Sequence, residues 1–152
     1  MKDSLSTLPG FFPFGATPTS DADLQPGEVP ILIRSDLFDI SAAASEQVIF
    51  SNRFGFSLRI LDAYLVWSEA TEASGPAEGD ITVGTTTGGA EIVAAKAYTA
   101  SLAVGAVEAL TLVTNVLANG AEIFASHDQA ASATGTFYLF ILLAVPQQGQ
   151  LG

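Results

Sequence analysis

The chain has 152 residues, which suits one domain with a hydrophobic core of its own. Apolar residues make up 49% of it and charged residues 14%, which excludes a disordered or coiled-coil composition. Acidic residues outnumber basic ones by 16 to 5, giving a net charge of −11 that favours solubility. This charge excludes a protein that binds nucleic acid through its phosphates, and it disfavours binding to an anionic membrane.

Three further absences narrow the class of protein. The chain has no cysteine, so it has neither disulfides nor thiolate metal sites. The first residues lack the apolar run of a secretory signal. The longest apolar run, residues 137–145, is far short of the ~20 residues that a membrane-spanning helix needs. We therefore expect synthesis in the cytoplasm and no membrane partner.

Residues 1–28 differ from the rest of the chain. Prolines at positions 9, 13, 18 and 26 prevent a continuous helix and disfavour a central strand. The segment also carries three closely spaced aromatic residues, Phe11, Phe12 and Phe14, which are too apolar for a solvated tail. The sequence therefore predicts an extended N-terminal arm that packs these rings on a surface. That surface belongs either to the arm's own domain or to a neighbouring molecule.

From residue 29 the chain alternates between short apolar segments and turn residues. The first predicted strands cover residues 29–33, 47–50 and 56–67. In the third, the apolar phase switches near Leu61, which predicts a bulge or a change of sheet environment. Residues 68–79 are rich in Glu, Ser, Ala and Gly, and they predict an exposed loop.

The second half of the chain continues the pattern. Strands are predicted at residues 80–83, 91–100, 108–113, 122–125 and 136–145. Residues 91–100 would tolerate a helix, but their apolar positions keep no helical period. The last strand is almost entirely apolar, so both of its faces are expected to be buried. The sequence predicts an all-β fold: a single antiparallel β-sandwich (a jelly roll of about eight strands) over residues 29–146, with a polar tail at 147–152.

No set of residues indicates an enzyme. The single histidine, His127, stands beside Asp128 in a predicted exposed loop, and one histidine cannot supply the cluster that a cupin metal site needs. The nucleophile-elbow pattern Gly-x-Ser-x-Gly is missing. The glycine-rich turn at 84–89 lacks the lysine and the following helix of a phosphate-binding loop. We expect no catalytic activity.

Two acidic clusters are candidates for calcium. One comprises Asp21, Asp23 and Glu28, and the other Glu69, Glu72, Glu78 and Asp80. Calcium accepts irregular loops with several oxygen ligands, but neither cluster has the EF-hand spacing. Solvated acidic loops explain both clusters better. The sequence therefore predicts no metal and no cofactor.

Arg59 interrupts an apolar strand and must face either solvent or a subunit seam. Its planar guanidinium suits a seam, where it can bind a carboxylate through two hydrogen bonds. With only 5 basic residues in the chain, each is expected to have an acidic partner.

The order of phrases from residue 80 onward resembles a known group of proteins. The phrases are Asp80-Ile81-Thr82-Val83-Gly84, Glu91-Ile92-Val93, the strand at 108–113, Leu117 to Phe124, and Gly135 to Phe140. Together they are similar to the small jelly-roll proteins that decorate or cement tailed-phage capsids or form the base of head fibres. The resemblance covers about 65 residues and the preceding strand. It implies a homotrimer bound to the major capsid protein at three-fold or quasi-three-fold positions of the virion surface.

Two functions follow as hypotheses. The first is a trimeric capsid decoration protein that stabilises the shell mechanically. The second is a β-sandwich recognition module that binds host carbohydrate or another surface ligand on a head fibre or tail. A recognition module would need an exposed aromatic platform near the polar loop, formed by Tyr64 and Trp67. The strand context of these two residues predicts burial instead.

Overall fold

A computed structural model of the chain describes residues 23–71, 79–98, 101–130 and 132–147. The arm residues Phe11, Phe12 and Phe14 lie outside the described residues. Ten strands and no helix are found in the described ranges, so no described helix could cross a membrane. The strands are β1 (Glu28–Arg34), β2 (Phe38–Asp39), β3 (Ser45–Ser51), β4 (Leu58–Trp67), β5 (Asp80–Gly84), β6 (Val93–Ala97), β7 (Val107–Ala109), β8 (Val116–Leu117), β9 (Glu122–His127) and β10 (Thr136–Pro146).

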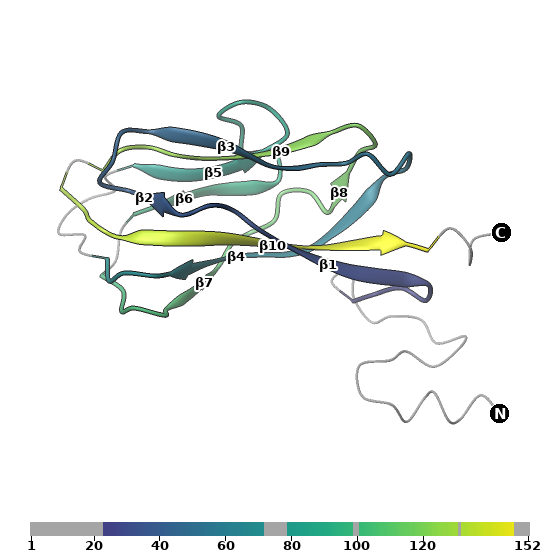
Figure 1. The fold of residues 1–152 in the computed structure, drawn as a ribbon, viewed down its shortest axis with the longest axis horizontal. Helices are drawn as coiled ribbons and strands as arrows, with labels where there is room; N and C mark the ends of the chain where they lie inside the picture. Colours follow the sequence, from purple (N-terminus) through teal and green to yellow (C-terminus); the bar gives the residue numbers. More distant parts are fainter. Residues whose placement is uncertain (1–22, 72–78, 99–100, 131, 148–152) are drawn as a thin grey trace, which may run out of the picture.

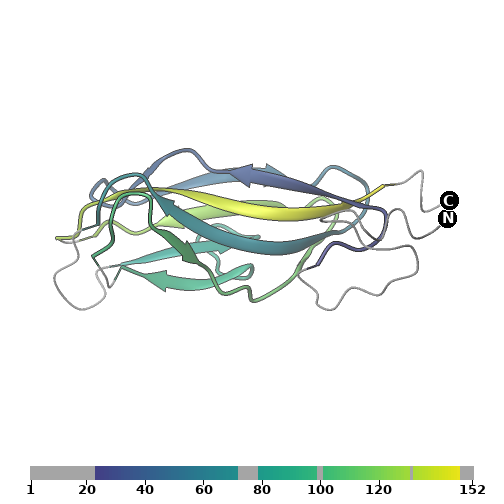
Figure 2. The same cartoon turned by 90° about the horizontal axis from the view of Figure 1, so that it is seen from below.

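The strands form two antiparallel sheets that pack face to face (Figure 1). The first sheet has the order β1-β10-β4-β7, with β2 and β8 as short additions. The second has the order β3-β9-β5-β6. Figure 2 looks onto the first sheet, with β10 and β4 crossing the molecule in front of the second. The predicted all-β sandwich is confirmed.

Leaving out the two-residue strands β2 and β8, the pairing is that of one long hairpin rolled up. The first strand pairs with the last, β1 with β10, and the next two pairs inward are β3 with β9 and β4 with β7. The innermost pair is β5 with β6. Successive pairs alternate between the two sheets, which is the jelly-roll order. Because β1 pairs with β10 from Glu28↔Pro146, the chain enters and leaves the sandwich at the same end.

The core lies between the sheets and follows the two-residue period of the strands. In β10 the alternate residues Phe137, Leu139, Ile141 and Leu143 point inward and are fully buried. The residues between them, Tyr138, Phe140 and Leu142, point outward and are only half-buried. The prediction that both faces of this strand are buried is therefore wrong. One face packs into the core, and the other is partly open because nothing in the described chain forms a third layer over it.

The bulge predicted near Leu61 is confirmed. Leu142 of β10 pairs with Asp62, but its neighbour Leu143 pairs with Ile60, so Leu61 is the extra residue in β4. The bulge lets the inward side of β4 pass from Leu58 and Ile60 to Ala63, Leu65 and Trp67, all of which are buried.

The alternating segment at 108–113 is not one strand as predicted, because the chain changes sheets within it. Residues 107–109 pair with β4, and the Leu110 N–H still donates to the Ala63 carbonyl in the same sheet. The Val113 N–H then donates to the Ile92 carbonyl beside β6 of the other sheet. Alternation of apolar residues continues through such a corner, so the pattern does not reveal it.

Candidate functional site

The described residues hold no cluster of three or more histidine and acidic side chains that could bind a metal ion. The two acidic clusters named from the sequence fall partly outside the described residues, which exclude Asp21, Glu72 and Glu78. Of the described members, Glu28 is engaged by Arg59, and Asp80 begins a strand. The expectation of a chain that needs no metal or cofactor stays a prediction.

His127 does not lie in an exposed loop as predicted. It is the last residue of β9, only 3% exposed, and its ring meets Phe38 edge-on at a centroid distance of 5.5 Å. Its Nδ1 lies 2.9 Å from the Asp128 carbonyl oxygen. The strand runs two residues beyond its predicted end, so the alternation of Ile123 and Ala125 continues to His127. This continued alternation is the signal in the sequence that predicts an inward position for His127. The imidazole ring packs in the core.

The burial predicted for Trp67 is confirmed, whereas Tyr64 faces outward. The Trp67 side chain is 3% exposed, and its Nε1–H donates to Glu108 Oε2 at 2.9 Å. The other Glu108 oxygen lies 3.2 Å from Lys96 Nζ on β6, so this carboxylate links the two sheets. Tyr64 instead stacks on Phe140 of β10 with their ring planes 8° apart. The two residues therefore do not form a common platform.

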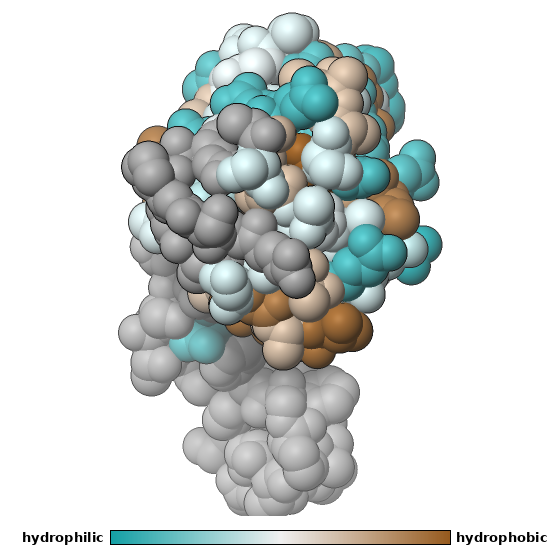
Figure 3. All heavy atoms as spheres, turned by 90° about the vertical axis from the view of Figure 1, so that its left-hand side faces the viewer, coloured by the Kyte–Doolittle hydropathy of each residue, from teal (hydrophilic) through white to brown (hydrophobic). Residues whose placement is uncertain are grey.

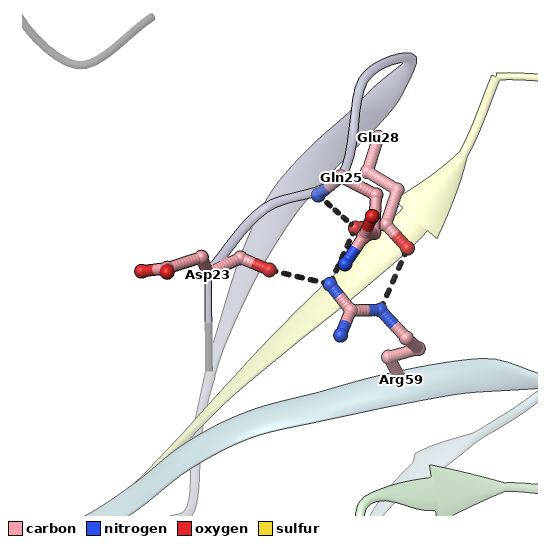
Figure 4. Close-up of polar contacts among 4 residues, drawn as sticks. All are labelled: Asp23, Gln25, Glu28 and Arg59. Atoms are coloured by element: carbon pink, nitrogen blue, oxygen red, sulfur yellow. Dashed lines mark hydrogen bonds and ion pairs between the residues drawn. The ribbon is translucent and has the colours of Figure 1, made fainter. Parts of the chain in front are cut away.

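Arg59 lies on the side of β4 that faces away from the core, where it binds the base of the N-terminal segment (Figure 4). Its Nε and Nη2 donate to the two carboxylate oxygens of Glu28 at 2.9 and 2.8 Å. Nη2 also donates to the Asp23 carbonyl oxygen. We call this group, made of Asp23, Gln25, Glu28 and Arg59, the arm clasp.

The local sequence explains the position of Glu28. Pro26 and Gly27 form the centre of a tight turn, in which the Glu28 N–H donates to the Gln25 carbonyl at 3.1 Å. Gly27 has a φ of 83°, a conformation that glycine adopts without strain. The Gln25 N–H in turn donates to Glu28 Oε2 at 2.7 Å. The turn thus aims the carboxylate across β10 toward Arg59.

Two opposing effects act on the Glu28 carboxyl. Burial raises its pKa, but the hydrogen bonds from Arg59 and from the Gln25 N–H, together with the Arg59 charge, bring the pKa below its ordinary value. The carboxylate is therefore ionised in the clasp at neutral pH. Arg59 is occupied within its own chain, and the choice between solvent and a subunit seam for its outward side stays open to test.

Most of the surface beside the clasp is apolar. It is the outward side of the six-stranded sheet, and we call it the outer face. Its strand residues are Glu28, Pro30, Leu32 and Arg34 of β1, Asp39 of β2, Thr136, Tyr138, Phe140, Leu142, Ala144 and Pro146 of β10, Arg59, Asp62, Tyr64 and Val66 of β4, Val107 and Ala109 of β7, and Val116 of β8.

The outer face has aromatic residues at its centre and exposed aliphatic residues at its edges. Phe140 stacks on Tyr64 at 5.2 Å, and the Arg34 guanidinium lies over the Tyr138 ring at 4.7 Å. Leu32 is 53% exposed and Val107 is 64% exposed. Figure 3, an end-on view, shows hydrophobic surface gathered at the lower side of the molecule, the side on which Figure 1 places β7.

The opposite surface, on the four-stranded sheet, is more polar. There the Thr82 and Ser126 hydroxyls bond at 2.6 Å, and Ser51 donates to Glu122 at 3.0 Å. Val48, which is 52% exposed, pairs with Phe124 as an isolated apolar pair. The sandwich therefore has one polar side and one apolar side. Alternation in the sequence predicts which residues point outward. It does not predict which of the two sheets carries the polar outward residues and which carries the apolar ones.

Comparison with known proteins gives one relevant likeness of fold. No family model matches the chain, and no curated protein matches it. Among solved structures, a chain of the capsid asymmetric unit of cyanophage Pam1 is similar, with a TM-score of 0.50 and 15% sequence identity. The match covers 91% of this chain and 100% of that chain. At this identity the likeness is one of fold.

Proposed function

We propose that this chain is a structural virion protein that binds the outer surface of a phage capsid as a trimer and stabilises the shell. One observation supports this most strongly: its fold resembles, over 91% of its length, a complete chain from a phage capsid asymmetric unit. A whole-chain match indicates a likeness of the entire sandwich rather than of one shared motif.

The surfaces of the molecule support the same proposal. Its described residues offer no cluster for metal chemistry, and its histidine is buried in the core. Its most unusual surface is the apolar outer face, and large apolar patches mark sites of protein association. A protein of this kind acts by adding buried contact area across capsid subunits.

The N-terminal arm supplies the attachment in this proposal. The clasp fixes the chain at Asp23, close to where it enters the sandwich. Two or three phenylalanine rings, each able to bury about 150–250 Å², would contribute several kcal/mol to binding. Phe11, Phe12 and Phe14 are the proposed contacts with the major capsid protein.

The test is co-sedimentation of the purified protein with empty shells of the phage that encodes it. We expect saturable binding, and a higher melting temperature for the decorated shell than for the bare one. A full-length variant with Phe11, Phe12 and Phe14 changed to Ser should keep its own melting temperature but bind at least 100-fold more weakly. Absence of binding by the unaltered protein would refute the proposal.

A recognition module is the second candidate, because Tyr64, Tyr138 and Phe140 face outward on one sheet. Aromatic rings on a sheet can stack on sugar rings. Binding of the protein to a glycan array, with loss of binding in Tyr138→Ala, would favour this function. Binding to shells without any glycan binding would favour decoration.

A further inference from the structure

We infer that the outer face of the six-stranded sheet is a contact surface between copies of this chain, in which the outer face of one copy packs against that of another. This deepens the proposed function, because it names the surface through which the proposed trimer assembles. It concerns contact between copies alone, and so it is tested without a capsid.

The first argument is the distribution of charge. The outward strand residues include two arginines, Arg34 and Arg59, and three carboxylates, Glu28, Asp62 and Asp39, so the face carries a net charge of only −1. The rest of the chain then holds 3 basic and 13 acidic residues, and −10 of the net charge of −11. Two strongly anionic copies repel each other least when they approach through a surface with little net charge. The outer face meets this condition.

The second argument is chemical composition. Interface centres are enriched in Tyr, Phe and Arg and depleted of Lys and Glu. The centre of the outer face is formed by two pairs of side chains that are already in contact, Tyr64 with Phe140 and Arg34 with Tyr138. Pre-stacked rings lose little side-chain entropy on contact. The exposed side chains of Leu32 and Val107, on β1 and β7, can exclude water from these aromatic residues when two copies are in contact.

The third argument is the size of the face. β1, β10, β4 and β7 have 7, 11, 10 and 3 residues, and at about 3.3 Å per residue and ~4.8 Å between strands they cover ~490 Å². This is more than half of the ~800 Å² per partner of a standard stable interface. Three such faces can surround an axis as the sides of a prism, which gives closed three-fold symmetry.

The β1 edge of the sheet is hindered from pairing with another strand, which favours the face over this edge as the route of association. The bonds from Gln147 N–H to the Gly27 carbonyl and from Ser35 N–H to the Leu139 carbonyl place the odd-numbered residues of β1 in the hydrogen-bonded pairs with β10. The even-numbered positions face the open edge, where Pro30 has no N–H to donate. A partner strand added to β1 would therefore lack one of its hydrogen bonds, at Pro30.

Leu32→Glu, on the outer face, tests the inference against Val48→Glu. The two residues are matched: both lie on edge strands, point away from the core, and are 53% and 52% exposed. The full-length proteins are compared by sedimentation velocity at micromolar concentration, with thermal unfolding to verify the fold. Val107→Glu provides a second outer-face variant if Leu32→Glu fails to fold.

We expect the unaltered protein and Val48→Glu to sediment at a multiple of 15.7 kDa. Leu32→Glu should fall toward the monomer mass, with a dissociation constant at least 100-fold higher, because the contact would bury an unpaired carboxylate. A monomeric unaltered protein would overturn the inference, as would equal masses for the two variants.

Covering of the face by the chain's own arm would also overturn the inference. It would appear as a monomer that associates only when Phe11, Phe12 and Phe14 are changed to Ser. Binding to shells is measured separately, so failure of the proposed function is distinguished from failure of this contact.

Discussion

Arg59 and Glu28 form a two-bond ion pair that crosses a strand: the arginine stands on β4, the glutamate on β1, and β10 runs between them. The pair lies on the outer side of Ala144, which is fully buried although it faces away from the core. The clasp thus closes one end of the outer face and holds the chain where it enters the sandwich.

Loss of this pair should destabilise the domain. In Arg59→Ala, Glu28 keeps only its bond from Gln25, and we expect the free energy of unfolding to fall by about 2–3 kcal/mol. Urea unfolding measures this. The matched control is Arg53→Ala, whose pair with Glu122 is long at 3.4 Å and solvent-exposed, with an expected change below about 0.5 kcal/mol. Equal losses in the two variants would contradict the role of the clasp.

Acid should weaken the clasp. The pKa of Glu28 is lower in the folded chain than its ordinary value of 4.5. The pair therefore contributes fully above that value, and the contribution is lost as the pH falls through the lower folded pKa. Glu28→Gln should be less stable than the unaltered protein at pH 7 but show a smaller loss between pH 5 and pH 3. Unfolding free energies measured across this range check the expectation, and parallel curves would refute it.

The single tryptophan reports on the core. Because Trp67 is buried and bonded to Glu108, its emission should be blue-shifted in the native protein and poorly quenched by iodide. Unfolding should shift the emission to the red and expose the ring to quencher. Native quenching as strong as that of the unfolded chain would show that the ring is open to solvent, as a recognition platform requires.

Salt should strengthen association between copies. The proposed contact surface carries a net charge of only −1, whereas each copy as a whole carries −11. Raising NaCl from 50 to 500 mM screens their mutual repulsion and leaves the apolar contact intact. The dissociation constant measured by sedimentation should therefore fall. An increase would indicate that attraction between charged groups holds the copies together.

Chelation should leave stability unchanged. The described residues contain no cluster suited to a metal, and the proposed functions need none. The melting temperature in EDTA is expected to match that in buffer within about 1 °C. A drop of many degrees, restored by calcium, would locate a site among the acidic residues.

Local chemistry in the sequence determined the class of fold. Two-residue alternation and turn residues predicted most of the strands, and the phase change at Leu61 marked the bulge, because both signals depend only on neighbouring residues. The same alternation would have placed His127 inside, had the strand been extended to it.

Long-range pairing decided the rest. The register between β4, β10 and β1 brings Glu28 beside Arg59, residues 31 positions apart, and no local pattern records this. The same register gathers Leu32, Phe140 and Tyr64 on one outer face. In the sequence, the last strand looked buried on both sides because apolar residues mark a core and an interface alike. Only the tertiary structure separates the two, because it shows which side meets the opposite sheet.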